Sequence, residues 1–509
     1  MSGLVPNKGM PSFALSSRFT VARWIFARAL GGIFFCAFAS LGVQIRGLAG
    51  AHGIVPAAEF LNEVWNKLGS GAVWQVPTLC WLNAGDTMLV ALCIAGVALS
   101  LVLICGVMPG LCSLLLWGLY LSLCWVAIPF TEFQWDSLLL ETALPGAVLL
   151  PWRIRPRWNQ WRPSQQAALW VLWWLLFRLM FESGAVKLSS GDKTWWGFTA
   201  LEYHFETQPL PIWTAWFANQ IPTWILSLAV FIMFFIELFA PWLIIAPRRW
   251  RHGAAWSLIA LQIGILTTGN YTFFNFLSIS LCLLLFDDGA WPARLRERWR
   301  TDAATVQSWT ALVSSLTAPV LAVIVLLTAE PLLSPVGLAS RWPAALSKLG
   351  ETVEPLMSFN GYGLFRVMTV SRHEIAVEGS DDRENWKEYE FRWKPGDLNE
   401  RPRLVAPHQP RLDWQMWFAA LGSIRNNPWF VRFLVRLLEG SPEVLKLLRT
   451  NPFPEHPPRY VRALAYDYHF TRFGDGHPGW WKREPLGLYC PPITLRQDGQ
   501  PMLVEPTRP

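Results

Sequence analysis

The chain has 509 residues, of which 52% are hydrophobic and 16% are charged, and its formal net charge is +7. Soluble proteins carry about 25% charged residues, so this composition excludes a disordered chain and argues against an entirely soluble one. The basic residues lie in short clusters between apolar runs. They do not form one basic face, so no nucleic-acid partner is expected and the clusters are interpreted as membrane-topology signals.

Long apolar runs predict membrane-spanning helices, because about 20 apolar residues are needed to cross the hydrocarbon core and backbone in lipid must satisfy its own hydrogen bonds. Residues 136–150 form a shorter run, and residues 253–286 are split at 267–270 into two short helices. The sequence therefore predicts about nine membrane segments. The full-length runs are 22–44, 85–107, 110–129, 166–188, 223–246 and 308–329.

Clusters of Lys and Arg give the predicted helices a direction. They precede the first span and recur in alternate loops, at 150–166, 246–253 and 286–308, whereas the loops between them carry few basic residues. Cytoplasmic loops are enriched in Lys and Arg, so the N-terminus is expected in the cytoplasm. An odd number of spans then places the C-terminal region in the periplasm or the ER lumen. The chain is expected in the inner membrane if bacterial and in the ER membrane if eukaryotic.

The predicted fold is an α-helical multi-pass membrane bundle followed by a soluble mixed α/β, sandwich-like C-terminal domain. Strands are expected within 362–393 and over 460–473, from alternating apolar residues and turn signals. Amphipathic periodicity predicts helices over 412–422 and 428–439, and Pro442 begins a short one over 443–449. The expected divisions are a cytoplasmic tail at 1–21, a membrane domain at 22–329 and the C-terminal domain at 330–509.

Charged residues inside the predicted spans form the first candidate site, because a charge in the bilayer is costly. Arg178 and Glu182 are spaced i, i+4 and can meet on one helix face. Glu141 lies at a similar depth on the preceding antiparallel span, so the three side chains can cluster. Such a cluster is either functional or a buried ion pair that fixes helix packing. The charged residues are Asp136, Glu141, Arg178, Glu182, Lys187 and Glu237.

Lys187 lies near the outer end of its predicted span. It either extends its ammonium group to the interface or is a desolvated lysine that acts as a base. No catalytic sequence motif accompanies it. The two interpretations stay open at this point.

The outer loop 189–222 is the second candidate site. Its tryptophans are typical of an interfacial aromatic belt, but they can also form an apolar surface that contacts a client protein. His204 and Glu206 are too few for a metal site, and neither a metal nor a cofactor is expected. The candidate client-contact residues are Trp195, Trp196, His204, Glu206, Trp213 and Trp216.

Cysteine usage points to no redox motif, since the chain has eight cysteines and no C-x-x-C. Most of them lie within apolar runs, where they act as small packing residues. Cys80 and Cys490 are the two expected on the oxidising side. They either pair with each other or remain free thiols.

Several stretches together resemble the lipase maturation factor family, over nearly the whole chain from about residue 20 to 495. The resemblance implies a multi-pass membrane protein that helps secreted lipases fold and assemble. In animals the family resides in the ER membrane with its C-terminal domain in the lumen. The stretches are 133–142 (FQWDSLLLET), 181–188 (FESGAVKL), 190–192, 203–211 (YHFETQPLP), 268–275 (TGNYTFFN), 362–365 (YGLF), 378–382 and 406–417 (APHQPRLDWQMW).

Two functions follow from these observations. The first is a non-enzymatic, chaperone-like folding factor with secreted lipases as clients. The second rests on the segment around Lys187 and Trp196, which also resembles the membrane domain of vitamin K-dependent carboxylases. That likeness implies a membrane enzyme with Lys187 as base and Glu141, Arg178 or Glu182 as its partners.

Overall fold

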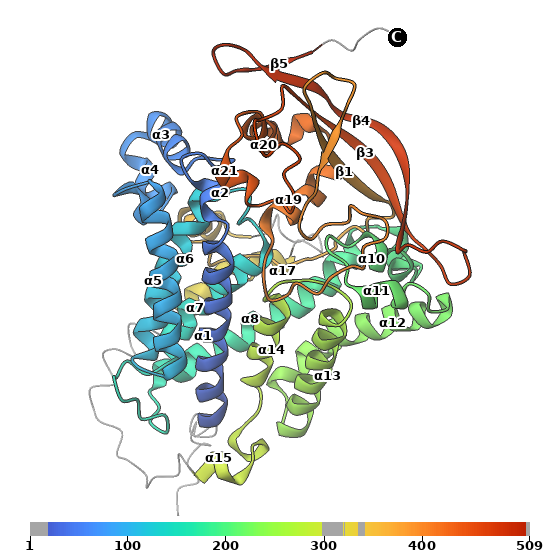
Figure 1. Ribbon diagram of the computed structural model, residues 1–509. Coiled ribbons are helices and arrows are strands. Elements are labelled where there is room, and N and C mark those ends of the chain that lie inside the picture. Colours follow the sequence, from blue (N-terminus) through green and yellow to red (C-terminus); the bar gives the residue numbers. More distant parts are fainter. Residues whose placement is uncertain (1–18, 298–318, 320, 334–341, 505–509) are drawn as a thin grey trace, which may run out of the picture.

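The computed structural model describes residues 19–297, 319, 321–333 and 342–504. Within them a helical bundle carries the C-terminal domain at one end (Figure 1). Eight helices of this described part run between the two ends of the bundle. They are α1 (Thr20–Gly42), α5 (Asp86–Cys105), α6 (Pro109–Val126), α7 (Gln134–Leu149), α8 (Pro163–Ser189), α12 (Thr223–Phe239), α13 (Arg248–Leu266) and α14 (Phe274–Leu283).

Five stretches in the described residues are long and apolar enough to cross a membrane: α1, α5, α6, α8, and α12 with the 3-10 turn that follows it to Ile245. The predicted break in residues 253–286 is confirmed, because α13 ends at Leu266 and α14 begins at Phe274. The predicted span 308–329 lies largely outside the described residues, and an apolar helix is described over Leu321–Leu333. The count of nine therefore stays a prediction.

The arginine-rich loops meet at one end of the bundle. Near the start of α1, the amide of Val21 donates to Asp288 at 2.8 Å, and the Arg23 guanidinium donates to the carbonyl of Gln160 at 3.0 Å. The Arg248 side chain pairs with Asp287 at 2.7 Å. The loops after α7, α12 and α14 thus lie beside the N-terminal end of α1, and we call this the basic end.

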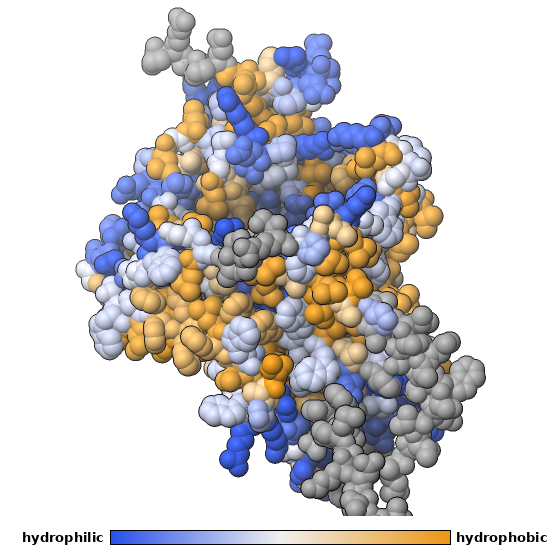
Figure 2. Space-filling model, turned by 180° about the vertical axis from the view of Figure 1, so that it is seen from behind, coloured by the Kyte–Doolittle hydropathy of each residue, from blue (hydrophilic) through white to orange (hydrophobic). Residues whose placement is uncertain are grey.

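The C-terminal domain lies at the opposite end, on loops 45–84 and 189–222 (Figure 1). Arg436 donates to the carbonyl of Gly53 at 2.8 Å, and Trp216 donates to Thr471 at 3.1 Å. Figure 2 shows hydrophobic side chains gathered between these two ends. This is the separation that the loop charges predict, and the compartment that each end faces stays a prediction.

Short helices lie in the connections between the longer ones and in the connection to the C-terminal domain. An isolated helix of this length is marginal in water, and most of these helices bury side chains against the rest of the chain. They are α2 (Ile45–Ala49), α3 (Ala57–Leu68), α4 (Ala72–Gln75), α9 (Lys193–Trp196), α10 (Ala200–Thr207), α11 (Trp213–Ala218), α15 (Ala293–Glu297), α17 (Glu330–Leu333) and α18 (Ala344–Val353).

The C-terminal domain contains one antiparallel sheet in the order β2-β1-β3-β4-β5. The predicted strands are confirmed as β1, β2 and β3. Sequence reasoning missed β4, because its residues are largely exposed and include three prolines, which hide the alternation of a strand. The strands are β1 (Arg372–Ser380), β2 (Lys387–Tyr389), β3 (Tyr460–Phe470), β4 (Trp481–Leu495) and β5 (Pro501–Leu503).

The predicted sandwich-like arrangement is wrong for the described residues, because helices cover the sheet in place of a second sheet. The predicted helices appear as α19 (Arg411–Ala420), α20 (Pro428–Leu438) and a shorter α21 (Pro442–Leu445). α20 presents an apolar stripe on which Phe430 and Phe433 are fully buried. The Phe430 ring lies 5.3 Å from Tyr489 on β4.

The bundle and the C-terminal domain share one hydrophobic core. The ring of Trp135 on α7 lies 4.7 Å from Trp414 on α19, and the ring of Phe130 lies 5.4 Å from Trp429 on α20. Continuous aromatic packing of this kind contributes stability beyond the area that it buries. The domain is therefore fixed on the end of the bundle opposite the basic end.

Candidate functional site

Three fully buried arginines lie where the bundle meets the C-terminal domain, and we call this contact zone the junction. Arg178 is 1% exposed, and Arg372 and Arg411 are 0% exposed. A buried charge is tolerated only when it is paired and hydrogen-bonded. The partners of the three arginines therefore show how the two parts of the molecule are held together.

Arg411, the first residue of α19, binds Asp136 in the first turn of α7. Its two terminal nitrogens contact both carboxylate oxygens, at 3.0 and 2.9 Å, which is the bidentate geometry that favours arginine. They also donate to the carbonyl of Phe130 at 2.6 Å and to the Tyr120 hydroxyl at 3.1 Å. Burial lowers and the Asp136 charge raises the pKa of Arg411, and the net shift is upward.

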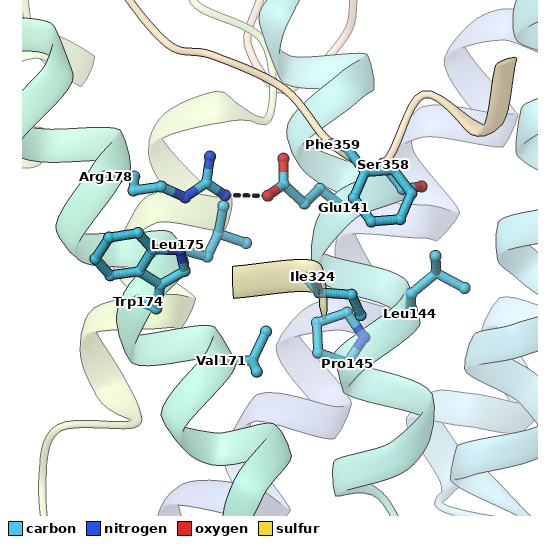
Figure 3. Close-up of a pocket in the computed structure, with 10 residues that line it drawn as sticks. All are labelled: Glu141, Leu144, Pro145, Val171, Trp174, Leu175, Arg178, Ile324, Ser358 and Phe359. Atoms are coloured by element: carbon cyan, nitrogen blue, oxygen red, sulfur yellow. Dashed lines mark hydrogen bonds and ion pairs between the residues drawn. The ribbon is translucent and has the colours of Figure 1, made fainter. Parts of the chain in front are cut away.

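The predicted cluster of Glu141, Arg178 and Glu182 forms around a segment from the C-terminal region. Arg178 on α8 pairs with Glu141 on α7, and the two side chains point toward one another (Figure 3). Arg178 also donates to the carbonyl of Asn360 at 2.7 Å. Glu182 accepts from the amide of Tyr362 at 2.7 Å. Each predicted side chain thus holds backbone that lies outside the bundle.

Tyr362 completes this cluster. Its hydroxyl donates to Glu141 at 2.7 Å, and burial together with the Glu141 charge raises the pKa of Tyr362 well above its usual value. The hydroxyl therefore stays protonated as a donor. The cavity beside Glu141 and Arg178 holds about 10 Å³, which is the room of one water. The space does not admit a substrate.

The surroundings of Lys187 bear on both interpretations of this residue. Its ammonium group is buried and donates to both carboxylate oxygens of Glu237 on α12, at 3.0 and 2.8 Å. The ammonium group therefore does not extend to the interface, whereas the role of Lys187 as a base with Glu141, Arg178 or Glu182 as its partners stays a hypothesis. The Glu237 carboxylate on α12 contacts the Lys187 ammonium group on α8, and this pairing offsets the cost of removing both charges from water.

Two junction residues were missed by sequence reasoning as site residues. Arg372 on β1 donates to the carbonyls of Glu206, at 2.7 Å, and Pro209, at 2.9 Å, and to the Glu374 carboxylate at 2.7 Å. No local pattern marks it as a junction residue, because its carbonyl partners lie more than 160 residues away in the sequence. Asn270 does stand out, as a polar residue in an apolar run.

Asn270 joins the break between α13 and α14 to two other segments. Its amide nitrogen donates to the carbonyls of Leu210, at 3.1 Å, and Arg403, at 2.8 Å. Its oxygen accepts from the amides of Val405, at 2.7 Å, and Ala406, at 3.1 Å. The nitrogen and the oxygen of this buried side-chain amide therefore both bind backbone of the C-terminal domain.

Three residues of the predicted client-contact loop form hydrogen bonds to other parts of the molecule. Trp195 is 3% exposed and donates to the carbonyl of Phe365 at 3.0 Å. His204 contacts the Tyr271 hydroxyl at 3.0 Å, and burial followed by the charge of Lys187 lowers its pKa to about 4. Glu206 accepts from the amide of Phe470 at 2.7 Å. These three side chains serve the contact between loop and domain.

Trp213 and Trp216 of the loop belong to a partly exposed aromatic cluster. The ring of Trp216 lies 4.7 Å from Phe473 and 5.3 Å from Trp480, both in the turn between β3 and β4. Phe217 lies 6.0 Å from Trp213. Phe473 is 66% exposed, Phe217 45% and Trp213 41%. We call these residues, Trp213, Trp216, Phe217, Phe473 and Trp480, the aromatic ridge. Trp196 is also exposed, beside the end of α8.

Neither a disulfide nor a metal centre occurs in the part of the chain that the structure describes. Cys80 and Cys490 are buried free thiols, and burial raises the pKa of Cys490 to about 11. Within the same residues, no three His, Cys, Asp or Glu side chains gather as metal ligands would.

These features define a helical membrane protein that carries a mixed α/β domain fixed to one end of its bundle. Residues 21–293 match the lipase maturation factor transmembrane domain, and residues 358–491 match the lipase maturation factor C-terminal domain. The chain belongs to the lipase maturation factor family.

The relatives extend over most of the chain. Lipase maturation factor 2 of Xenopus laevis is 36% identical over 93% of this chain and 82% of its own length, and that of Homo sapiens is 35% identical over 94% and 83%. Lipase maturation factor 1 of Homo sapiens is 32% identical over 96% of this chain and 90% of its own. No solved structure matches the chain.

Proposed function

We propose that this protein is a membrane-anchored maturation factor that holds secreted lipases while they fold, without changing a covalent bond in them. Its relatives are named as lipase maturation factors. In this proposal residues 1–21 are cytoplasmic, residues 22–329 form the membrane domain, and residues 330–509 form a domain in the periplasm or the ER lumen.

The aromatic ridge is the observation that carries the proposal. A folding lipase exposes apolar surface, and exposed aromatic clusters mark sites of protein interaction. Aromatic anchors also supply much of the energy of such contacts. The ridge combines side chains of the outer loop and of the C-terminal domain, so it exists only while these two parts are held together.

The junction supports this proposal by keeping the ridge in place. Glu206 binds the end of β3, and Trp216 donates to Thr471 in the turn that follows. Arg178 and Glu182, two members of the predicted charged cluster, form hydrogen bonds to the backbone of Asn360 and Tyr362. A fixed, apolar surface at the edge of the bundle suits a holding role.

A membrane enzyme based on Lys187 is the competing function. The pairing of its ammonium group with both oxygens of Glu237 favours a structural role, because the group that would take a proton is already a donor. Exchanging the two charges in Lys187→Glu/Glu237→Lys separates these functions, because the ion pair is kept while the lysine leaves its position.

The proposed function is tested by co-expressing the full chain with a secreted lipase and measuring the specific activity of the secreted enzyme. The ridge variant is Trp213→Ser/Phe217→Ser/Phe473→Ser. The matched control is Leu486→Ser/Leu488→Ser on β4, whose side chains are 53% and 56% exposed. We expect the ridge variant to lower secreted lipase activity at an unchanged level of membrane protein, and the control to leave it unchanged. Full activity with the ridge variant would overturn the proposal.

A further inference from the structure

A cavity of about 270 Å³ lies at the basic end, on the side of the bundle away from the C-terminal domain. It is formed where the chain leaves α7 and enters α8. Its wall includes three arginines with exposed side chains, and its floor includes the buried residues Ser164 and Gln165. We call Arg153, Arg157, Arg162, Ser164 and Gln165 the basic pocket.

The backbone around the basic pocket is held from several sides. The amide of Met108 donates to the carbonyl of Arg153 at 3.1 Å, and the amide of Gly110 donates to that of Pro151 at 2.9 Å. Gln165 accepts from Arg23 on α1 at 3.1 Å. Contacts from α1 and from the turn between α5 and α6 therefore fix this loop. A preformed site of this kind loses little entropy when it binds a ligand.

The charge of the basic pocket is not neutralised within the described residues. None of the ion pairs found there involves Arg153, Arg157 or Arg162, although ion pairs occur at Arg248 and Arg251 of the same end. The pocket also includes the first turn of α8, a helix of 27 residues. The positive end of the helix dipole adds to the attraction for an anion there.

The surroundings of the basic pocket are apolar on one side. Trp152, which lines it, is 49% exposed, and the neighbouring Ile154 is 67% exposed. Both lie in the loop between α7 and the membrane-crossing α8, and tryptophan is enriched at the boundary between headgroups and acyl chains. A ligand in the pocket would therefore lie at the level of the lipid headgroups.

We infer that the basic pocket binds a phosphate-bearing anion, such as the headgroup of an acidic phospholipid or a soluble phosphate compound. Guanidinium groups bind phosphate oxygens in a two-pronged geometry, and basic pockets between membrane helices suit acidic headgroups. The volume admits a headgroup, and the apolar edge at Trp152 and Ile154 favours the lipid source. This inference does not depend on the proposed function.

The test uses the full chain purified in a neutral detergent and follows its thermal unfolding. The probes are short-chain phosphatidylglycerol, short-chain phosphatidylcholine and inorganic phosphate. The pocket variant is Arg153→Gln/Arg157→Gln/Arg162→Gln. The control is Arg155→Gln/Arg294→Gln/Arg296→Gln, which removes the same charge from exposed arginines of the same end that do not line the pocket.

We expect phosphatidylglycerol to raise the Tm of the wild type and of the control in a saturable way. The pocket variant should bind it about tenfold more weakly or worse, since a charge-assisted hydrogen bond contributes about that factor. Equal protection by inorganic phosphate, again lost only in the pocket variant, would assign the site to soluble phosphates. Equal protection by phosphatidylcholine, an unchanged response of the pocket variant, or no response to any probe would overturn the inference.

Discussion

The arginines of the junction and those of the basic pocket have different surroundings. At the junction, Arg411 is fully buried, and both its terminal nitrogens contact the carboxylate of Asp136. At the basic end, Arg153 and Arg157 line an open cavity with exposed side chains. The same residue type therefore holds the fold together at the junction and lines an exposed cavity at the basic pocket.

This difference shows that burial and pairing decide the role of a charged residue more than its position near a membrane does. A desolvated guanidinium with a carboxylate partner leaves an uncompensated charge when either group is removed. A solvated guanidinium at a pocket rim is already hydrated, so its removal costs the fold little. The predictions below test this contrast.

The largest effect is expected at the Arg411–Asp136 pair. Arg411→Ala leaves the Asp136 carboxylate buried without its partner, and we expect a loss of about 3–5 kcal/mol of stability. Thermal unfolding in detergent and the yield of folded protein measure this loss. Arg411→Met/Asp136→Leu removes both charges and should recover part of the stability. An Arg411→Ala protein with the wild-type Tm would contradict the account.

A smaller but still large effect is expected at the Lys187–Glu237 pair. Lys187→Met should destabilise the contact between α8 and α12 by about 3 kcal/mol, because Glu237 is left buried and unpaired. The exchange Lys187→Glu/Glu237→Lys restores the pair in reverse. We expect it to recover both Tm and lipase maturation. A folded exchange variant that has lost maturation would favour the membrane enzyme.

Acidification should weaken the junction through its partly buried histidines, His408 and His204. Burial, followed by the charges of Arg411 and Arg392, lowers the pKa of His408 to about 4. The usual value is about 6.5, so the unfolded chain binds more protons between pH 6.5 and 4. The stability that a neutral His408 contributes is therefore present above pH 6.5 and is lost as the pH falls toward 4. His204 acts in the same direction.

Asp413 opposes the two histidines, since burial raises its pKa to about 6. Its destabilising contribution is present above pH 6 and diminishes as the pH falls. We expect a net decrease in Tm from pH 7 to pH 5, and a smaller decrease in His408→Gln. Tm values of wild type and variant across this range check the sign. A decrease of equal size in both would show that His408 does not titrate as described.

The smallest effect on stability is expected at the basic pocket. In the absence of lipid, Arg153→Gln/Arg157→Gln/Arg162→Gln should change the stability by no more than about 0.5 kcal/mol, as surface substitutions do. Thermal unfolding of the lipid-free protein measures it beside Arg411→Ala. Comparable losses of stability in the two variants would show that the arginines of the junction and of the basic pocket do not differ in their contribution to the fold.

Much of the bundle could be predicted from the sequence, because apolar length and loop charge act locally. The split between α13 and α14 followed from the polar residues at 267–270, and the cluster around Arg178 followed from helical spacing. The partner of Lys187 could not be predicted, since Glu237 lies 50 residues away on another helix. The sequence also did not distinguish buried from exposed tryptophans in the loop 189–222. Trp195 is buried and Trp213 is exposed, and only tertiary contacts separate them.

The most direct test of the proposed function is site-specific photo-crosslinking in native membranes that also contain a folding lipase. A benzoylphenylalanine replaces Phe473 on the aromatic ridge, and a matched protein carries it at Asp498, an exposed residue between β4 and β5. The account predicts that the newly made lipase is captured from position 473 and not from position 498. Capture of lipase equally at both positions, or at neither, would contradict it.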